Sequence, residues 1–227
     1  MKFTFVHSFD LTPSEARAVQ CELRRKVRND DAITRLRNVA GLDVGMDRAS
    51  GMARAAAVVL SYPALELIEE AVVLQPLRFP YVPGLLSFRE IPPLLAVLEE
   101  LATEPDLLMC DGHGLAHPRR FGLACHLGVI TNLPTIGVAK SKLIGEYRMP
   151  AEKRGSRSAL MHRGERIGTV LRTRDGVKPV FVSIGHCVSL KQAERITLTC
   201  AKRYRIPQPT RLADARASAR APARSTR

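Results

Sequence analysis

The fold is decided by the segment Leu107-Leu-Met-Cys-Asp-Gly-His-Gly-Leu-Ala-His-Pro-Arg-Arg120. Four apolar residues open it without alternation, a pattern typical of a strand that is buried on both faces of a sheet. Asp111 follows where this strand ends, and open α/β sheets bind their ligands at the carboxyl ends of strands. The loop behind it carries two histidines, His113 and His117, and two arginines. An isolated Asp-Gly is usually a plain turn, but this loop gathers enough titratable and cationic groups to predict a functional site.

The composition indicates one globular domain that is neither exported nor inserted into a membrane. The chain has 227 residues, of which 45% are hydrophobic and 25% are charged. No apolar run approaches the length that crosses a bilayer, and the first residues turn polar too soon for a secretory signal. The five cysteines show no paired short spacing, so we expect reduced thiols rather than disulfides or a zinc cluster. We therefore expect a cytoplasmic protein, and a monomer.

The formal net charge of +13 is the strongest compositional feature. An excess of positive charge of this size predicts a polyanionic partner. A membrane surface would also attract it, but no strongly amphipathic basic helix with an aromatic face is visible, and tryptophan is absent. Nucleic acid is the partner that the charge favours.

The apolar pattern predicts an α/β fold in residues 1–214, with a mixed five-stranded central sheet flanked by helices and an additional C-terminal hairpin and helix. An antiparallel meander comes first, and a strand, helix and strand in that order then imply parallel pairing. Residues 146–163 are expected to form a surface loop, and residues 215–227 a disordered basic tail because they lack core-forming side chains. The expected strands are 38–47, 55–60, 65–74, 107–111 and 135–139, with a hairpin at 166–171 and 179–183; the expected helices are 13–29, 89–101, 121–129 and 189–201, and a short one capped by Thr210.

Three residues outside the opening segment are also candidates for a functional site. Asp43 lies between apolar neighbours in an expected strand, where an unpaired carboxylate is costly and a metal is a usual compensation; the alternative is an edge strand with Asp43 in water. Glu90 starts an expected helix, where it could be only a favourable charge at the helix N-terminus. Tyr81 lies between Pro80 and Pro83, which stiffen a loop and present the ring; the alternative is a core tyrosine.

Five segments, in order and with comparable spacing, resemble the endonuclease V family of deoxyinosine 3′-endonucleases. The resemblance runs from about residue 10 to about residue 214. It implies a ribonuclease H-like fold and a DNA-repair enzyme that recognises deoxyinosine and hydrolyses the second phosphodiester bond 3′ to the lesion, leaving 3′-OH and 5′-phosphate. It also implies Mg²⁺ as cofactor, with Mn²⁺ as substitute, and inosine-containing RNA as a further partner. The segments are Gly41-Leu-Asp-Val-Gly45, Pro80-Tyr-Val-Pro-Gly-Leu-Leu-Ser-Phe-Arg-Glu90, Asp111-Gly-His-Gly-Leu-Ala-His-Pro-Arg-Arg120, Pro134-Thr-Ile-Gly-Val-Ala-Lys140 and Pro209-Thr-Arg-Leu-Ala-Asp214.

The resemblance also implies roles for individual residues. Asp43 and Asp111 match the principal metal ligands of the family, and Glu90 and Asp214 match the other two acids. Lys140 and His117 match positions near the scissile phosphate. Tyr81 resembles the wedge that fills the gap beside an extruded base. The other residues expected to contact substrate are Pro80, Pro83, Gly84, Gly112 and Gly137, and the basic tail matches nothing in the family.

The residues support this chemistry independently of the resemblance. Hydrolysis of a phosphodiester requires a nucleophile made from water and a stabilised anionic transition state, and hard divalent cations held by carboxylates supply both. A cysteine or serine hydrolase is the rival enzyme class, because Cys110 adjoins Asp111 and His113 is near. Successive strand residues point to opposite faces, however, so Cys110 is expected in the core. A non-catalytic nucleic-acid binder would not need four acids in so basic a chain.

Overall fold

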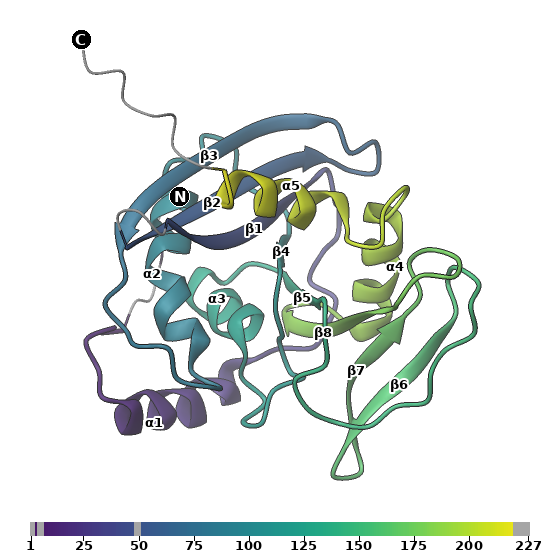
Figure 1. Ribbon diagram of the computed structural model, residues 1–227, viewed down its shortest axis with the longest axis horizontal. Helices are drawn as coiled ribbons and strands as arrows, with labels where there is room; N and C mark the ends of the chain where they lie inside the picture. Colours follow the sequence, from purple (N-terminus) through teal and green to yellow (C-terminus); the bar gives the residue numbers. More distant parts are fainter. Residues whose placement is uncertain (1–2, 4–6, 48–50, 220–227) are drawn as a thin grey trace.

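The computed structural model describes residues 3, 7–47 and 51–219, and these residues form one eight-stranded sheet with helices on both faces (Figure 1). The strand order is β3-β2-β1-β4-β5-β8-β7-β6. The strands are β1 (Asn38–Asp47), β2 (Met52–Ser61), β3 (Leu67–Pro76), β4 (Leu108–Cys110), β5 (Thr135–Ala139), β6 (Arg157–His162), β7 (Glu165–Leu171) and β8 (Val180–His186). The helices are α1 (Pro13–Leu23), the 3₁₀ turn η1 (Arg24–Lys26), α2 (Leu86–Glu99), α3 (Leu123–Thr131), α4 (Leu190–Cys200) and α5 (Gln208–Ala217).

The pairing of the first five strands confirms the predicted order. Strands β1, β2 and β3 form an antiparallel meander, and β4 pairs in parallel with both β1 and β5. The strand count was wrong, because β8 pairs antiparallel with β5. The predicted C-terminal hairpin, β7 and β8, is therefore a continuation of the central sheet, which has eight strands and not five.

Residues 146–163 are not wholly irregular, as the sequence had suggested. Residues 157–162 form β6 at the edge of the sheet, paired antiparallel with β7. Only Leu160 in this strand is buried. An edge strand that buries so little carries a weak hydrophobic pattern, which explains why it resembled a loop.

The helices cover opposite faces of the sheet. Helices α2 and α3 pack on Leu42, Ala57 and neighbouring side chains of one face. Helices α4 and α5 pack on Val39, Met109 and neighbouring side chains of the other, and α5 lies across β1 and β2 (Figure 1). A site at the end of β4 can therefore receive residues from both helical layers.

Two helices begin earlier than predicted, and α1 ends at Leu23, before η1, and not at residue 29 as predicted. Helix α2 begins at Leu86, so Glu90 lies in its second turn and Pro92 and Pro93 lie inside the helix. Helix α5 begins at Gln208 after Pro207 and has no side-chain cap; the predicted cap, Thr210, is buried and donates a hydrogen bond to the Pro207 carbonyl oxygen at 3.2 Å.

The start of the expected basic tail is part of α5. Residues 215–217 are helical, Ala217 is buried and Arg216 forms an ion pair with Glu70 at 2.9 Å. The helix continues past Asp214 because it packs on β1 and β2, a tertiary contact that composition does not reveal. The rest of the tail expectation, residues 220–227, lies outside the described residues.

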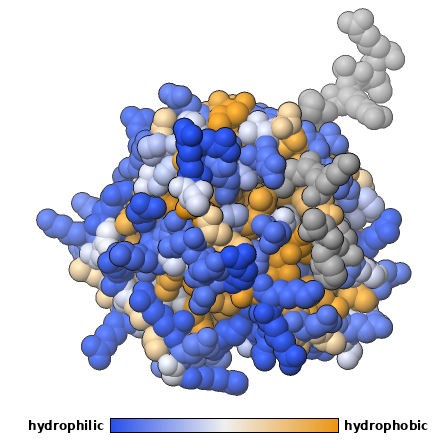
Figure 2. Space-filling model, turned by 180° about the vertical axis from the view of Figure 1, so that it is seen from behind, coloured by the Kyte–Doolittle hydropathy of each residue, from blue (hydrophilic) through white to orange (hydrophobic). Residues whose placement is uncertain are grey.

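One face of the protein is mostly hydrophilic, as a high content of charged residues predicts (Figure 2). No helix in the described part of the chain is long and apolar enough to cross a membrane. Hydrophilic residues cover most of the face shown in Figure 2, with smaller apolar areas between them.

Two glycines of β1 allow α5 to pack directly on the sheet. Gly41, Asp43 and Gly45 point to the same face of β1, since strand side chains alternate. A Cβ on Gly41 would lie 2.0 Å from the carbonyl carbon of Pro209, and one on Gly45 would lie 2.4 Å from the Ala217 carbonyl oxygen. The two glycines therefore accommodate both ends of α5, with Asp43 between them.

Gly41→Ala should lower the free energy of unfolding by roughly 1 to 3 kcal/mol, the usual cost of overpacking. The added methyl group meets the backbone of α5, which cannot move aside as a flexible side chain would. Urea denaturation of the purified variant measures this loss. An unchanged unfolding midpoint would show that α5 is not held against β1 as described.

Candidate active site

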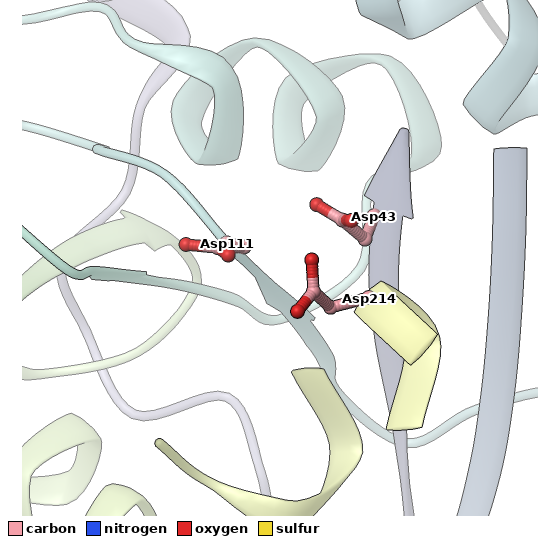
Figure 3. Close-up of side chains that lie close together, drawn as sticks. All are labelled: Asp43, Asp111 and Asp214. Atoms are coloured by element: carbon pink, nitrogen blue, oxygen red, sulfur yellow. The ribbon is translucent and has the colours of Figure 1, made fainter. Parts of the chain in front are cut away.

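Three acids predicted from the sequence converge at one end of the sheet (Figure 3). Carboxylate oxygens of Asp43, Asp111 and Asp214 lie within 4.8 Å of one another, and all three residues are half-buried. Asp43 comes from β1, Asp111 follows β4 and Asp214 lies on α5. We call these three residues the acid cluster.

Strand register explains why Asp43 and Asp111 are neighbours. Leu42 of β1 is paired with Cys110 of β4 in the parallel part of the sheet. The next residue on each strand is an aspartate, and the Asp111 amide donates to the Leu42 carbonyl oxygen at 3.4 Å. Cys110 is buried in the core, as predicted, and burial raises the pKa of its thiol, which leaves it unsuited to act as a nucleophile.

Glu90 is not one of the acids whose oxygens lie within 4.8 Å of one another, but the charges of two of those acids act on it. It is half-buried on α2, on the opposite side of the sheet from α5. Burial, followed by the charges of Asp43 and Asp111, raises the pKa of Glu90 to about 8, and Arg89 offsets part of this. The structure thus brings three of the four predicted acids within 4.8 Å of one another and keeps the fourth within electrostatic reach.

The acid cluster holds more negative charge than its own cations neutralise. Burial, and then the charges of Asp111 and Asp214, raise the pKa of Asp43 to about 7. Lys140 contacts the cluster: its Nζ lies 2.5 Å from Asp111 Oδ2 and 3.6 Å from Asp214 Oδ1. Burial lowers the pKa of Lys140, but the hydrogen bond to Asp111 and the charges of the three acids together outweigh burial, so the pKa is raised. One ammonium among these acids leaves an all-oxygen donor set that suits a hard divalent cation.

A mostly apolar cavity of about 160 Å³ lies beside the loop that follows Asp111. Tyr81 stands at this cavity and is 71% exposed, so it is not a core tyrosine. An apolar cavity of about 150 Å³ is enough to hold benzene, which sets the scale for binding a ring system. Among the residues predicted to contact substrate, the cavity is lined by Tyr81, Pro83, Gly84 and Gly112.

Three other predicted site residues lie away from the cavity lining or from the acid cluster. Pro80 is exposed and does not line the cavity. Gly137 is buried in β5, where a Cβ would lie 2.7 Å from the Gly112 carbonyl oxygen, so its contribution is close packing. His117 lines the cavity and does not contact the acid cluster.

His117 is neutral and fixes the cavity wall. Its Nε2 donates to the Gly84 carbonyl oxygen at 3.1 Å, and its Nδ1 accepts from the Arg119 amide at 3.2 Å. Burial, and then the charge of Arg119, lower the pKa of His117 to about 4. Gly84 has φ of +77°, which favours glycine, and its carbonyl also accepts from Arg119 Nη2 at 2.6 Å.

Sequence reasoning gave no role to several residues of the cavity. Gln20, far away in the chain, donates to the carbonyl oxygens of Gly84 and Phe121, each at 3.1 Å. His113, a residue of the opening segment with no predicted role, also lines the cavity. Burial lowers its pKa to about 4. Nothing in the local pattern marked Gln20, because its partners are distant in sequence. The other unassigned lining residues are Val82, Leu86, Ser87, Gly122, Leu123 and Leu143.

Comparisons with known proteins agree with this geometry. The family model of endonuclease V matches residues 21–215. The endonuclease V of Trichormus variabilis is 52% identical over 215 residues, which cover 94% of this chain and 97% of that relative. The endonuclease V of Roseiflexus sp. is 50% identical over 218 residues, which cover 96% of this chain and 97% of that relative.

Solved structures extend the likeness to three dimensions. The endonuclease V from Streptomyces avermitilis superimposes with a TM-score of 0.89 at 49% identity, covering 92% of this chain and 93% of that chain. A structure of Ciona intestinalis endonuclease V in complex with a 24mer DNA, containing an inosine followed by a ribo-adenosine, gives a TM-score of 0.79 at 31% identity, covering 89% of this chain and 94% of that chain. The chain therefore belongs to the endonuclease V family and is a nuclease.

Proposed function

We propose that the chain is a DNA-repair endonuclease that recognises deoxyinosine and hydrolyses the second phosphodiester bond 3′ to it, leaving 3′-OH and 5′-phosphate. The observation that carries the proposal is the position of the acid cluster beside an apolar cavity with Tyr81 at its mouth. The inosine-containing DNA bound to the Ciona relative supports the choice of substrate. The meander β1–β3, joined in parallel to β4 and β5, supports the ribonuclease H-like description.

The acid cluster would hold Mg²⁺, or Mn²⁺ in its place, with Glu90 close behind. A divalent cation bound there would lower the pKa of a water molecule and neutralise charge that develops on the phosphate. Lys140 orients Asp111 through their 2.5 Å contact and places a second positive charge where the phosphate approaches. Glu90, with its pKa raised to about 8, retains its proton at neutral pH when no cation is present.

The cavity would receive the base once it has left the helical stack. Extruding a base costs a few kcal/mol, and a ring that stacks in the vacated position recovers roughly 1 to 3 kcal/mol. Tyr81 is exposed, and the prolines at 80 and 83 restrict its loop. The neutral His117 and the carbonyl of Gly84 are held in one hydrogen-bonded arrangement, so the wall is formed before the base arrives.

One gel tests the proposal directly. An end-labelled duplex with a single deoxyinosine should be cut in Mg²⁺, not in EDTA, at the second bond 3′ to the lesion. The same duplex with deoxyadenosine should remain intact, and a strand with inosine as a ribonucleotide measures the preference between DNA and RNA. Equal cleavage of the deoxyadenosine duplex would refute lesion recognition.

Asp43→Asn and Asp111→Asn should each reduce cleavage in Mg²⁺ by at least about 100-fold, because losing even the outer partners of a metal ligand costs about 10- to 100-fold. Binding to the deoxyinosine duplex in EDTA should remain measurable. Asp30→Asn is the control, since Asp30 forms an exposed ion pair with Arg28 instead of joining the cluster. Full activity in either cluster variant would remove that residue from the catalytic site.

Without metal, stability should fall as pH rises from about 6.5 to about 8.5, the window above the usual histidine pKa. The folded-state pKa values of Asp43 and Glu90, about 7 and about 8, are raised above their usual values. A carboxyl with a raised folded pKa stabilises the protein at low pH, and this contribution is lost as pH rises through that pKa. The buried histidines have lowered pKa values and act only below this window.

Thermal unfolding in EDTA at several pH values measures this decline, and Mg²⁺ should raise Tm most at the upper end, where the ligands are ionised. The double variant Asp43→Asn, Glu90→Gln should show a shallower decline than the unaltered protein. Equal slopes in the two proteins would assign the pH dependence to other groups.

Tyr81→Ala should weaken binding and incision of the deoxyinosine duplex by about 10-fold or more, because the stacking ring is lost. Tm should hardly change, since the side chain is 71% exposed. Tyr81→Phe is the matched control and should keep most of the affinity, because it keeps the ring. A large drop in Tm together with normal lesion affinity would remove Tyr81 from the substrate site.

A further inference from the structure

Arg211 is a cation on the same helix as one residue of the acid cluster. It lies on α5, three residues before Asp214, and residues with this spacing are neighbours on a helix surface. Its guanidinium carbon lies 4.3 Å from the ring centroid of Tyr204, which belongs to the connection between α4 and α5 and is 50% exposed. The aromatic ring therefore supports a positive charge one helical turn from a cluster acid.

Arg211 has no anionic partner in the described part of the chain. No hydrogen bond or ion pair joins its side chain to another described residue, and its Nε is buried without an acceptor. The neighbouring arginines differ: Arg216, on the same helix, pairs with Glu70 at 2.9 Å, and Arg205 donates to the carbonyl oxygens of Lys178 and Pro179 at 2.8 and 2.9 Å. The described residues therefore leave the guanidinium of Arg211 without an acceptor.

The position of Arg211 identifies that ligand. The base cavity is lined from the α2 and α3 side of the sheet, by residues such as Ser87 and Leu123, whereas α5 and Tyr204 lie on the other side. The acid cluster joins the two sides, because Asp214 lies on α5 and Asp111 adjoins Gly112, which lines the cavity. A strand whose base occupies the cavity and whose backbone crosses the acids continues toward Arg211. We propose that Arg211, stacked on Tyr204, binds a backbone phosphate of the substrate strand on the side of the acid cluster away from the base cavity.

The chemistry of both partners suits this role. A guanidinium offers parallel donors that match two phosphate oxygens, and stacking on tyrosine fixes its plane before the phosphate arrives. Less side-chain entropy is then lost on binding. The acids repel an approaching phosphate, and Lys140 is the cation in contact with them. Arg211 adds a second positive charge on the far side, so the strand is attracted from both ends of the cluster.

The direction of the strand rests on the proposed function, and the test is therefore a binding measurement that needs no cleavage. Affinity for a duplex with one deoxyinosine, and for the same duplex without it, is measured by fluorescence anisotropy in EDTA over a series of salt concentrations. Arg211→Gln should weaken both by about 10-fold. It should also reduce the slope of log K against log salt by about 0.9, the value for one phosphate contact.

Control variants separate a phosphate contact from loss of charge or of packing. Arg216→Gln removes the same charge from the same helix, but that charge is already paired, so affinity and slope should stay near those of the unaltered protein. Tyr204→Phe keeps the stack and should bind normally, whereas Tyr204→Leu should lose part of the affinity. Arg211→Lys should keep the salt slope and lose part of the affinity, because lysine cannot bind in a bidentate way.

The outcomes distinguish this inference from the proposed function. An unchanged salt slope in Arg211→Gln, or an equal loss in Arg216→Gln, overturns the phosphate site. A lower Tm in Arg211→Gln with an unchanged slope does the same, since it shows a packing role alone. Failure of the unaltered protein to cut the deoxyinosine duplex would refute the proposed function, while the slope difference in EDTA would still establish the phosphate contact.

Discussion

The close packing of α5 on β1 is the constraint on which the acid cluster depends. Gly41 and Gly45 let the helix backbone approach the strand more closely than any side chain would allow. Asp43, between them on the same face, is thereby brought to Asp214. The two glycines thus connect residues that lie far apart in the chain, and a motif that resembles flexible punctuation acts through close packing.

The electrostatics of this arrangement oppose its stability. Burial, and then the repulsion between the carboxylates, raise the pKa of Asp43 and of Glu90, and Lys140 offsets only part of the repulsion. The hydrophobic cores on both faces of the sheet offset this unfavourable electrostatic energy. Strongly perturbed groups gathered at one cleft are typical of functional sites, and a cation that relieves the repulsion gains affinity from the same strain.

Sequence reasoning reached the central strands and the acids because each had a local signal. Leu107 to Cys110 formed an apolar run that ended in an acid, and Asp43 interrupted another. Features that depend on distant partners were missed. Strand β6 buries a single residue, and α5 is extended by its contact with the sheet. Gln20 is held at the cavity by hydrogen bonds to carbonyl oxygens far along the chain. The sequence also did not show that His117 lines the cavity, because it does not reveal which way a loop side chain points.

The loop from Asp111 to Gly114 joins the acids to the base cavity, and its rigidity relates one to the other. Asp111 belongs to the acid cluster, while Gly112 and His113 line the cavity. Gly114 has no room for a side chain, since a Cβ would lie 1.9 Å from the Ile184 carbonyl oxygen. Its backbone amide is also fixed, because it donates a hydrogen bond to Ser183 Oγ at 2.8 Å. Under the proposed function, a base in the cavity would be held at a fixed distance from the acid cluster. In a nucleic-acid strand, that distance corresponds to a fixed number of bonds, so cleavage at a constant offset from the base would follow from the close packing of this loop.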